Sequence, residues 1–188
     1  MGIATLWLTV LVALLRTNFD VFGRLPISYL GIFQTSKQLF DGGLIIASVL
    51  LLIFLTFLTR KLRPSKWFIY IFMIGQLCQI VVALTPYNAH SVIKSIHVIS
   101  AFGLAFTLPF SMRAFKHSVA VPVHLRTLTG RFLRVELLLF VLGLGWFILA
   151  SKAGALSEIV TAIGFDVWIV WLSVRLRPAT SFTPEYSK

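Results

Sequence analysis

The chain has 188 residues, of which 58% are hydrophobic and only 12% carry a charge, and this composition excludes an ordinary soluble domain. Its 17 Lys and Arg residues outnumber 6 Asp and Glu residues, but they stand at the ends of apolar runs, which favours membrane topology over nucleic-acid binding. Since these runs lack the alternating pattern of a transmembrane β-barrel, we expect an all-α integral membrane protein with a single domain over residues 1–188.

Six apolar stretches predict a bundle of six membrane-spanning helices, since each crossing needs about 20 residues. In chain order they cover residues 3–15, 42–59, 67–85, 91–112, 132–150 and 155–176. Two connections are longer than a bundle needs. Residues 17–40 contain an apolar segment at 27–33 that suits a re-entrant or interfacial position. Residues 114–130 form a basic loop, which predicts anchoring by anionic lipid or, alternatively, a recognition site for an acidic lipid headgroup or a partner.

Lys and Arg are divided unevenly between the two sides of this predicted bundle. Twelve flank the second-to-third connection, the fourth-to-fifth connection and the C-terminus, and the other five lie on the opposite side. Cytoplasmic loops of membrane proteins are enriched in Lys and Arg. We therefore expect both termini to be cytoplasmic.

Polar side chains within the spans predict a pocket in the outer half of the bundle, because ionisable groups at that depth are costly and usually face the interior. Asp166 lies near the middle of the sixth span, and His97 lies about a third of the way into the fourth. The pocket candidates are Asp41, Gln79, His97, Ser100, Glu158 and Asp166. The alternative is that these groups form separate pairs that hold helices together.

Glu136 and Arg175 lie at similar depths near the cytoplasmic ends of the fifth and sixth spans. We expect them to form a buried ion pair whose role is structural rather than catalytic.

Metal-binding and catalytic motifs of the HExxH, CxxC, GxxxxGK[ST] and GxSxG types do not occur in the sequence. The histidines divide between the two sides of the predicted bundle, so we expect neither a three-histidine metal site nor a haem site, and no other cofactor. A metal site formed by His97 with Asp41 and Asp166 stays an alternative.

Three short motifs carry a family resemblance. Residues 27–31 read Ile-Ser-Tyr-Leu-Gly, and residues 38–46 follow as Gln-Leu-Phe-Asp-Gly-Gly-Leu-Ile-Ile. Residues 83–88 read Ala-Leu-Thr-Pro-Tyr-Asn, with His97 in the next span, and residues 171–176 read Trp-Leu-Ser-Val-Arg-Leu. Together they resemble a group of prokaryotic six-span membrane proteins of unknown function, distantly like the eukaryotic autophagy-modulator (DRAM) family.

The resemblance implies a six-helix bundle in the plasma membrane, and it implies no reaction. It singles out a few positions of this chain: Ser28, Gly31, Pro86, His97 and Arg175. The chain departs from the group's pattern at Tyr29, where an acidic residue is common, and at Thr85, where Gly-Phe is usual.

The sequence thus favours a non-enzymatic membrane protein that binds or moves a lipid or small amphiphile through the outer-half pocket. One alternative is an accessory subunit that packs against other subunits of a larger membrane complex. A further alternative is a proton- or ion-coupled transporter or channel that uses Asp166 and His97. An intramembrane enzyme comes last, because acid–base chemistry would require Asp41, His97 and Asp166 to come within hydrogen-bond reach.

Overall fold

A computed structural model describes residues 1–22, 25–88, 90–149 and 154–176. These residues form six α-helices and one short 3₁₀ helix, and they include no strand. The helices are α1 (Gly2–Thr17), η1 (Ile27–Gly31), α2 (Lys37–Leu62), α3 (Lys66–Leu84), α4 (Ser91–Lys116), α5 (Val123–Leu149) and α6 (Ala155–Arg175). The predicted all-helical class is therefore confirmed for this part of the chain.

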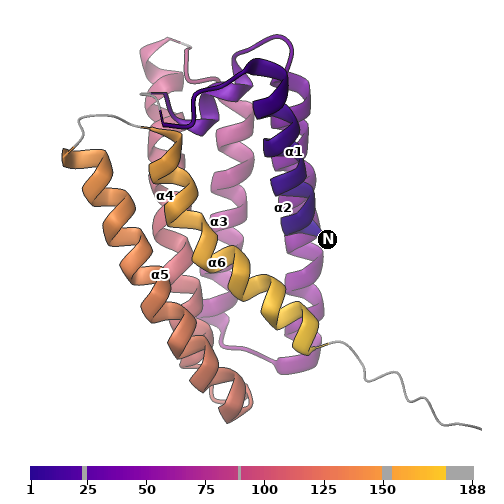
Figure 1. The fold of residues 1–188 in the computed structure, drawn as a ribbon. Coiled ribbons are helices and arrows are strands. Elements are labelled where there is room, and N and C mark those ends of the chain that lie inside the picture. Colours follow the sequence, from indigo (N-terminus) through magenta and orange to yellow (C-terminus); the bar gives the residue numbers. More distant parts are fainter. Residues whose placement is uncertain (23–24, 89, 150–153, 177–188) are drawn as a thin grey trace, which may run out of the picture.

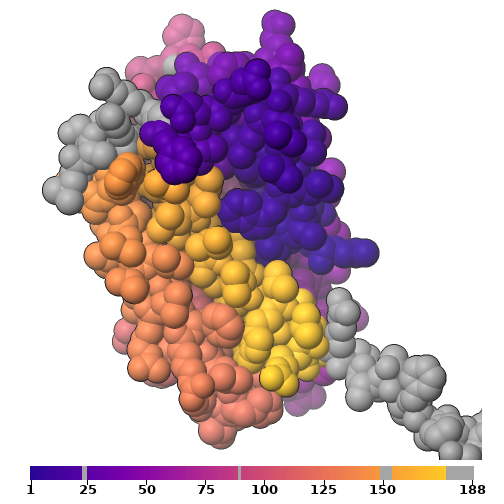
Figure 2. All heavy atoms as spheres, in the orientation of Figure 1, coloured from indigo at the N-terminus to yellow at the C-terminus, as the bar shows by residue number. Residues whose placement is uncertain are grey.

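The helices follow one another as an up-and-down series in which each packs against the next (Figure 1). α1 to α4 stand upright, whereas α5 and α6 run side by side and lean across them (Figure 1). α6 also contacts α4 and α1, so it closes the bundle. Figure 2 shows α6, in yellow, filling the seam between α5 and α1 on the face drawn. η1 lies across the end of the bundle where α2 begins, and it contacts α1, α2, α3 and α6.

Four helices, α2, α3, α4 and α6, are long and apolar enough to cross a membrane. α1 is apolar but has only 16 residues, about 24 Å at 1.5 Å per residue, which is less than the hydrocarbon thickness of a bilayer. Gly2 lies against Ala47 and Leu50, near the middle of α2, so α1 covers only the half of α2 nearest η1. α5 is 27 residues long and packs along α6.

Large apolar side chains face outward along these helices. Leu8, Ile53, Ile99 and Leu138 each expose more than half of their surface. A soluble monomer does not leave so many apolar side chains in water. The exposed surface therefore agrees with a membrane setting for the helices.

Local sequence explains where several helices begin and end. Arg63 closes α2 in the left-handed conformation at φ 46°, and Pro64 prevents continuation of the helix. Ser65 then caps α3 by accepting a hydrogen bond from the Phe68 backbone N–H at 3.3 Å. Asn18 closes α1 in the same left-handed way, at φ 48°.

The predicted basic loop at residues 114–130 is wrong for most of its length. α4 continues to Lys116, and α5 begins at Val123, directly after Pro122. The hydropathy pattern marks the apolar part of a helix, whereas charged turns at either end extend the same helix beyond it. The last residue of the predicted fifth span, Ala150, lies outside the described residues, as do the basic residues predicted to follow the sixth span.

An aromatic core lies in the half of the bundle away from η1. Phe68, Phe72, Phe115, Phe165 and Trp168 join in a continuous aromatic cluster, with ring centroids 5.2–6.0 Å apart. The Trp168 indole N–H in this cluster donates to Thr129 Oγ1 at 3.0 Å, so its polar atom is satisfied. Most of the predicted pocket residues lie nearer η1 than this cluster does.

Candidate functional site

Asp166 is buried near the middle of α6, where it accepts a hydrogen bond from α1. The Trp7 indole Nε1 donates to Asp166 Oδ2 at 2.9 Å. Only 6% of the Asp166 surface is exposed. The carboxylate therefore faces the bundle interior, as expected for an ionisable group in a span.

Glu158, two turns earlier on α6, holds η1 in place. Its Oε2 accepts a hydrogen bond from the Ile27 backbone N–H at 2.9 Å, at the start of the 3₁₀ helix. Pro26, the residue before η1, provides no side-chain cap. A carboxylate at a helix N-terminus satisfies free N–H groups. Glu158, although it belongs to α6, therefore caps the N-terminus of η1.

His97 is buried in the first half of α4 and is fixed by one ring nitrogen. Its Nδ1 lies 2.5 Å from the Thr85 carbonyl oxygen, while Nε2 has no hydrogen-bond partner among the described residues. The Tyr87 ring packs edge-on against the imidazole, with centroids 5.6 Å apart. A carbonyl oxygen only accepts, so Nδ1 carries the proton and Nε2 of the neutral ring keeps a lone pair.

Gln76 and Gln79 lie on the buried face of α3. Gln79 donates from Nε2 to the Leu44 carbonyl of α2 at 3.3 Å. Gln76 is 2% exposed, and its Oε1 has no partner within the described part of the chain.

Two chambers occupy the half of the bundle nearest η1. The aromatic chamber, between α4, α5 and α6, has a volume of about 190 Å³ and is lined by Phe102, Phe106, Phe140 and Phe147, together with His97 and Glu158. The central chamber has a volume of about 170 Å³ and is lined by Trp7, Gln76, Gln79, Phe165 and Asp166, together with Glu158. Glu158 therefore borders both.

Small side chains separate the two chambers. Ala101 and Ala105 of α4, Thr161 and Glu158 of α6, and Ser28 of η1 line both. Larger residues at these α4 positions would fill the space between α4 and α6. The divided space corrects the prediction of one shared pocket.

The aromatic chamber reaches the outer surface between α4 and α5. Phe102 and Phe106 line it and are also 39% and 45% exposed on the outside of α4. Each pairs with a phenylalanine of α5: Phe102 with Phe147 at 5.8 Å, and Phe106 with Phe140 at 5.2 Å between centroids. These two pairs stand where the chamber meets the surface.

The structure brings some predicted pocket residues together and leaves others apart. Gln79, Glu158 and Asp166 line the central chamber, and His97 lines the aromatic chamber with Glu158. Asp41 lies against Gly31 of η1 and lines neither chamber, although its neighbour Phe40 lines the central one. Ser100 is half-buried on α4 and lines neither chamber.

The predicted ion pair between Glu136 and Arg175 is not formed. Both carboxylate oxygens of Glu136 lack a hydrogen-bond partner among the described residues, and Arg175 is exposed. Glu136 packs against Gly164, eleven residues before Arg175 on α6 and therefore about 16 Å from it along the helix. The two spans are staggered, so depths counted along the sequence do not match across the interface.

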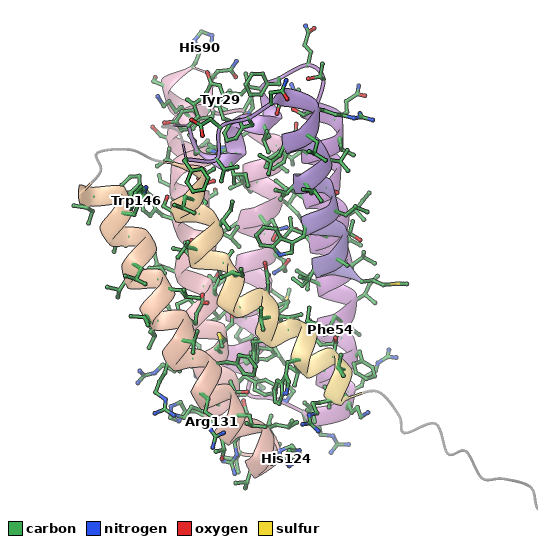
Figure 3. The ribbon with its side chains drawn as sticks, viewed as in Figure 1. Tyr29, Phe54, His90, His124, Arg131 and Trp146 are labelled. Atoms are coloured by element: carbon green, nitrogen blue, oxygen red, sulfur yellow. The ribbon has the colours of Figure 1, made fainter. Side chains whose placement is uncertain are left out.

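No group of three His, Cys, Asp or Glu side chains is placed to hold a metal ion within residues 1–22, 25–88, 90–149 and 154–176. The alternative metal site of His97, Asp41 and Asp166 is therefore not assembled. Figure 3 shows His90 at the η1 end of the bundle, with Tyr29, and His124 at the opposite end, with Arg131. The histidines near the two ends are thus kept apart.

A family model described as a protein of unknown function (DUF998) matches residues 1–175. The chain belongs to the DUF998 family. This match covers every residue that lines the two chambers. No curated protein and no solved structure matches the chain. Membership of a family of unknown function is thereby confirmed, while the likeness to the autophagy-modulator family stays a prediction.

Sequence reasoning missed several residues of the DUF998 chain that shape the chambers. Trp7 lies within an apolar run, and a tryptophan there is usually interpreted as a lipid-facing anchor, so it was not predicted to face the interior. Thr161 and the alanines of α4 carry no signal of their own, since small residues are common at helix contacts. Only the buried carboxylate, which requires a donor, indicated that such a partner exists.

Proposed function

We propose that this protein is a non-enzymatic, six-span plasma-membrane protein, with both termini cytoplasmic, that holds or moves a lipid or small amphiphile through its two chambers. The observation that carries the proposal is the pair of adjoining chambers that share Glu158 and the small residues of α4. Their walls are apolar with a few polar groups, which is typical of sites for small molecules.

The volumes suit a modest ligand segment. An apolar cavity of about 150 Å³ in another protein binds benzene, so the aromatic chamber of about 190 Å³ has room for roughly eight carbon atoms. An amphiphile from the bilayer would reach the chamber past Phe102 and Phe106, which face both the chamber and the outside. Lateral access of this kind requires no aqueous path for the apolar chain.

A chamber-filling variant tests the proposal. Ala105→Phe places a ring in the wall common to both chambers, whereas Ala4→Phe makes the same change on the exposed face of α1. Native mass spectrometry of the purified proteins would measure co-purified amphiphile. We expect bound mass in the wild type and in Ala4→Phe, and its loss in Ala105→Phe. Absence of bound mass from the wild type, or equal occupancy in all three, would contradict the proposal. Ala105→Leu, a smaller change, covers the case in which Ala105→Phe does not fold.

A proton-coupled transporter is the second candidate, and one observation favours it. Asp166 and Glu136 are two buried carboxylates without a Lys or Arg partner among the described residues, and buried carboxylates within spans are typical of proton pathways. Proton flux into liposomes through the wild type, reduced by at least about tenfold in Asp166→Asn, would support this candidate. Unchanged flux in Asp166→Asn would contradict it.

The role of accessory subunit stays a prediction, and purification as a lone monomer would count against it.

A further inference from the structure

Four of the six polar side chains that line the aromatic chamber, those of His97, Ser157, Glu158 and Thr161, offer hydrogen-bond acceptors, whereas the hydroxyls of Ser28 and Tyr87 can also donate. Neither Lys nor Arg is among the described residues that line it. The nearest lysine along α4, Lys94, is exposed and places its ammonium 4.8 Å from the centroid of the Tyr87 ring, outside the lining. The part of the chamber wall that the structure describes thus offers no cation to an anionic headgroup.

The hydroxyl groups on α6 have already used their protons. Ser157 Oγ donates to the Gly154 carbonyl at 2.8 Å, and Thr161 Oγ1 donates to the Glu158 carbonyl at 2.9 Å. A hydroxyl that donates to its own helix keeps only lone pairs for a ligand. Ser157 and Thr161 therefore add acceptors, not donors, to the chamber wall.

His97 adds a further acceptor by its tautomer. Its Nδ1 proton is directed to the Thr85 carbonyl, so the unpartnered Nε2 carries the lone pair. The ring is 2% exposed and is held by Tyr87, so it cannot turn to water to satisfy that atom.

Glu158 is the strongest acceptor of the set. A carboxylate offers about four lone-pair sites, and the N-terminus of η1 uses only part of this capacity through the Ile27 N–H. A carboxylate within a span without a cationic partner is costly, and a ligand cation would offset that cost.

We infer that the chambers select amphiphiles whose polar end is a hydrogen-bond donor, an alkylammonium above all, with the ammonium at Glu158 and His97 and the alkyl chain among the phenylalanines. This inference rests on the proposed function and names its ligand class. In a bilayer the alkyl chain gains little by leaving lipid for an apolar chamber, so the polar end decides which amphiphile binds. Anionic amphiphiles such as fatty acids are disfavoured by the same carboxylate.

Three eight-carbon probes that differ only at the polar end test the inference. Tritiated octylamine would be bound to the purified protein in micelles at pH 7 and measured by scintillation proximity, with octan-1-ol and octanoate as competitors. We expect unlabelled octylamine to displace the label at a concentration about tenfold lower than octan-1-ol does, because its hydrogen bond to Glu158 is charge-assisted. Octanoate should compete least. Ala105→Phe supplies the background from micelle partitioning.

Two variants assign the preference to Glu158. Glu158→Gln keeps an acceptor oxygen for the Ile27 N–H but removes the charge, and it should reduce the octylamine preference to below about threefold. Asp20→Asn removes the same charge from an exposed position outside both chambers and should leave the preference unchanged. Thermal unfolding of both variants shows whether each is folded.

The outcomes separate this inference from the proposed function. Equal displacement by all three probes, or a preference that survives in Glu158→Gln, overturns the donor-headgroup inference while the chambers still bind amphiphiles. Preference for octanoate overturns it in the same way. If no probe binds above the Ala105→Phe background, and the wild type carries no co-purified lipid, the proposed function fails as well.

Discussion

The indole of Trp7 and the carboxylate of Asp166 join the first and last helices of the described chain, with 2.9 Å between Nε1 and Oδ2. α1 and α6 touch at few other points, whereas each packs extensively on its neighbour in sequence. The hydrogen bond therefore fastens α1 across the central chamber, and it satisfies a carboxylate at the depth where an unpaired charge is most costly.

Replacement of Trp7 by phenylalanine should destabilise the bundle. The change keeps an aromatic ring but removes the only donor that Asp166 has among the described residues. Interhelical hydrogen bonds in membranes contribute about 0.6 kcal/mol on average and up to about 1.7 kcal/mol. We expect Trp7→Phe to lower the free energy of unfolding by about 1–2 kcal/mol, because a charged acceptor is left without its donor. SDS titration of the reconstituted protein measures this.

Trp67→Phe is the matched control, since Trp67 is 74% exposed and should tolerate the change. A double-mutant cycle with Asp166→Asn would isolate the pairwise energy. Equal losses in Trp7→Phe and Trp67→Phe, or a coupling energy of zero, would show that the bond does not fasten α1.

Glu136 should be replaceable by an apolar residue with a gain in stability. Its side chain is fully buried, and both carboxylate oxygens lack partners among the described residues. Removal of an unsatisfied buried polar group recovers about 1–3 kcal/mol. We expect Glu136→Met, which is of similar size, to raise the free energy of unfolding by at least about 1 kcal/mol in the same SDS titration.

Arg175→Met is the partner experiment, because Arg175 is exposed on α6 and should change stability by no more than about 0.5 kcal/mol. Matching losses of stability in Glu136→Met and Arg175→Met would instead indicate that the predicted ion pair forms.

The helices were predictable from sequence to the extent that apolarity defines them. The four apolar runs that correspond to α2, α3, α4 and α6 are each found as a helix long and apolar enough to cross a membrane. The ends of the helices were not predictable in this way, because charged turns such as Lys37–Asp41 continue a helix without adding to its apolar run. Residues 27–33 were predicted only as a re-entrant or interfacial segment, and the 3₁₀ helix η1 within them was not predicted. One of its contacts, the hydrogen bond from the Ile27 N–H to Glu158, joins residues 131 positions apart in sequence.

The site was predictable at single residues but not in its arrangement. Because burial of ionisable groups in lipid is costly, Asp166 and His97 were predicted to face the bundle interior, and both are buried there. Which of these groups share a chamber depends on the stagger between neighbouring helices, and that stagger is fixed by packing contacts such as Gly164 against Glu136. This stagger cannot be derived from a single sequence. Asp41 and Glu136 were therefore given wrong neighbours.

Close packing of α5 on α6 should make Gly143 intolerant of a side chain. A Cβ at position 143 would lie 2.5 Å from Thr161 Cγ2 and 2.9 Å from the Ser157 carbonyl oxygen. Overpacking of this kind typically costs about 1–3 kcal/mol. We expect Gly143→Ala to lower the free energy of unfolding by that amount and to alter amphiphile binding, because Gly143 and Thr161 both line the aromatic chamber.

Gly145, two residues further along the same helix, provides the control. A Cβ there meets no atom within 4 Å, and alanine favours a helix over glycine by up to about 1 kcal/mol. Gly145→Ala should therefore be neutral or stabilising. A loss in Gly145→Ala as large as in Gly143→Ala would mean that α5 needs glycine flexibility rather than close contact with α6.

The aromatic cluster away from η1 should carry more of the bundle's stability than the lipid-facing aromatics. Phe115 is 0% exposed and contacts Phe68 and Trp168, with centroids 5.2 and 5.4 Å away, whereas Phe110 on the same helix is 54% exposed. Truncation of a buried phenylalanine leaves a cavity and typically costs about 3–5 kcal/mol. We expect Phe115→Ala to lose that much and Phe110→Ala to lose less than about 1 kcal/mol, because lipid refills the space at the surface. Since Phe115 lines neither chamber, a mild version of the change, Phe115→Leu, should lower the SDS midpoint and leave octylamine binding intact. A loss of binding in Phe115→Leu without loss of stability would mean that the ligand binds at the aromatic cluster and not in the chambers.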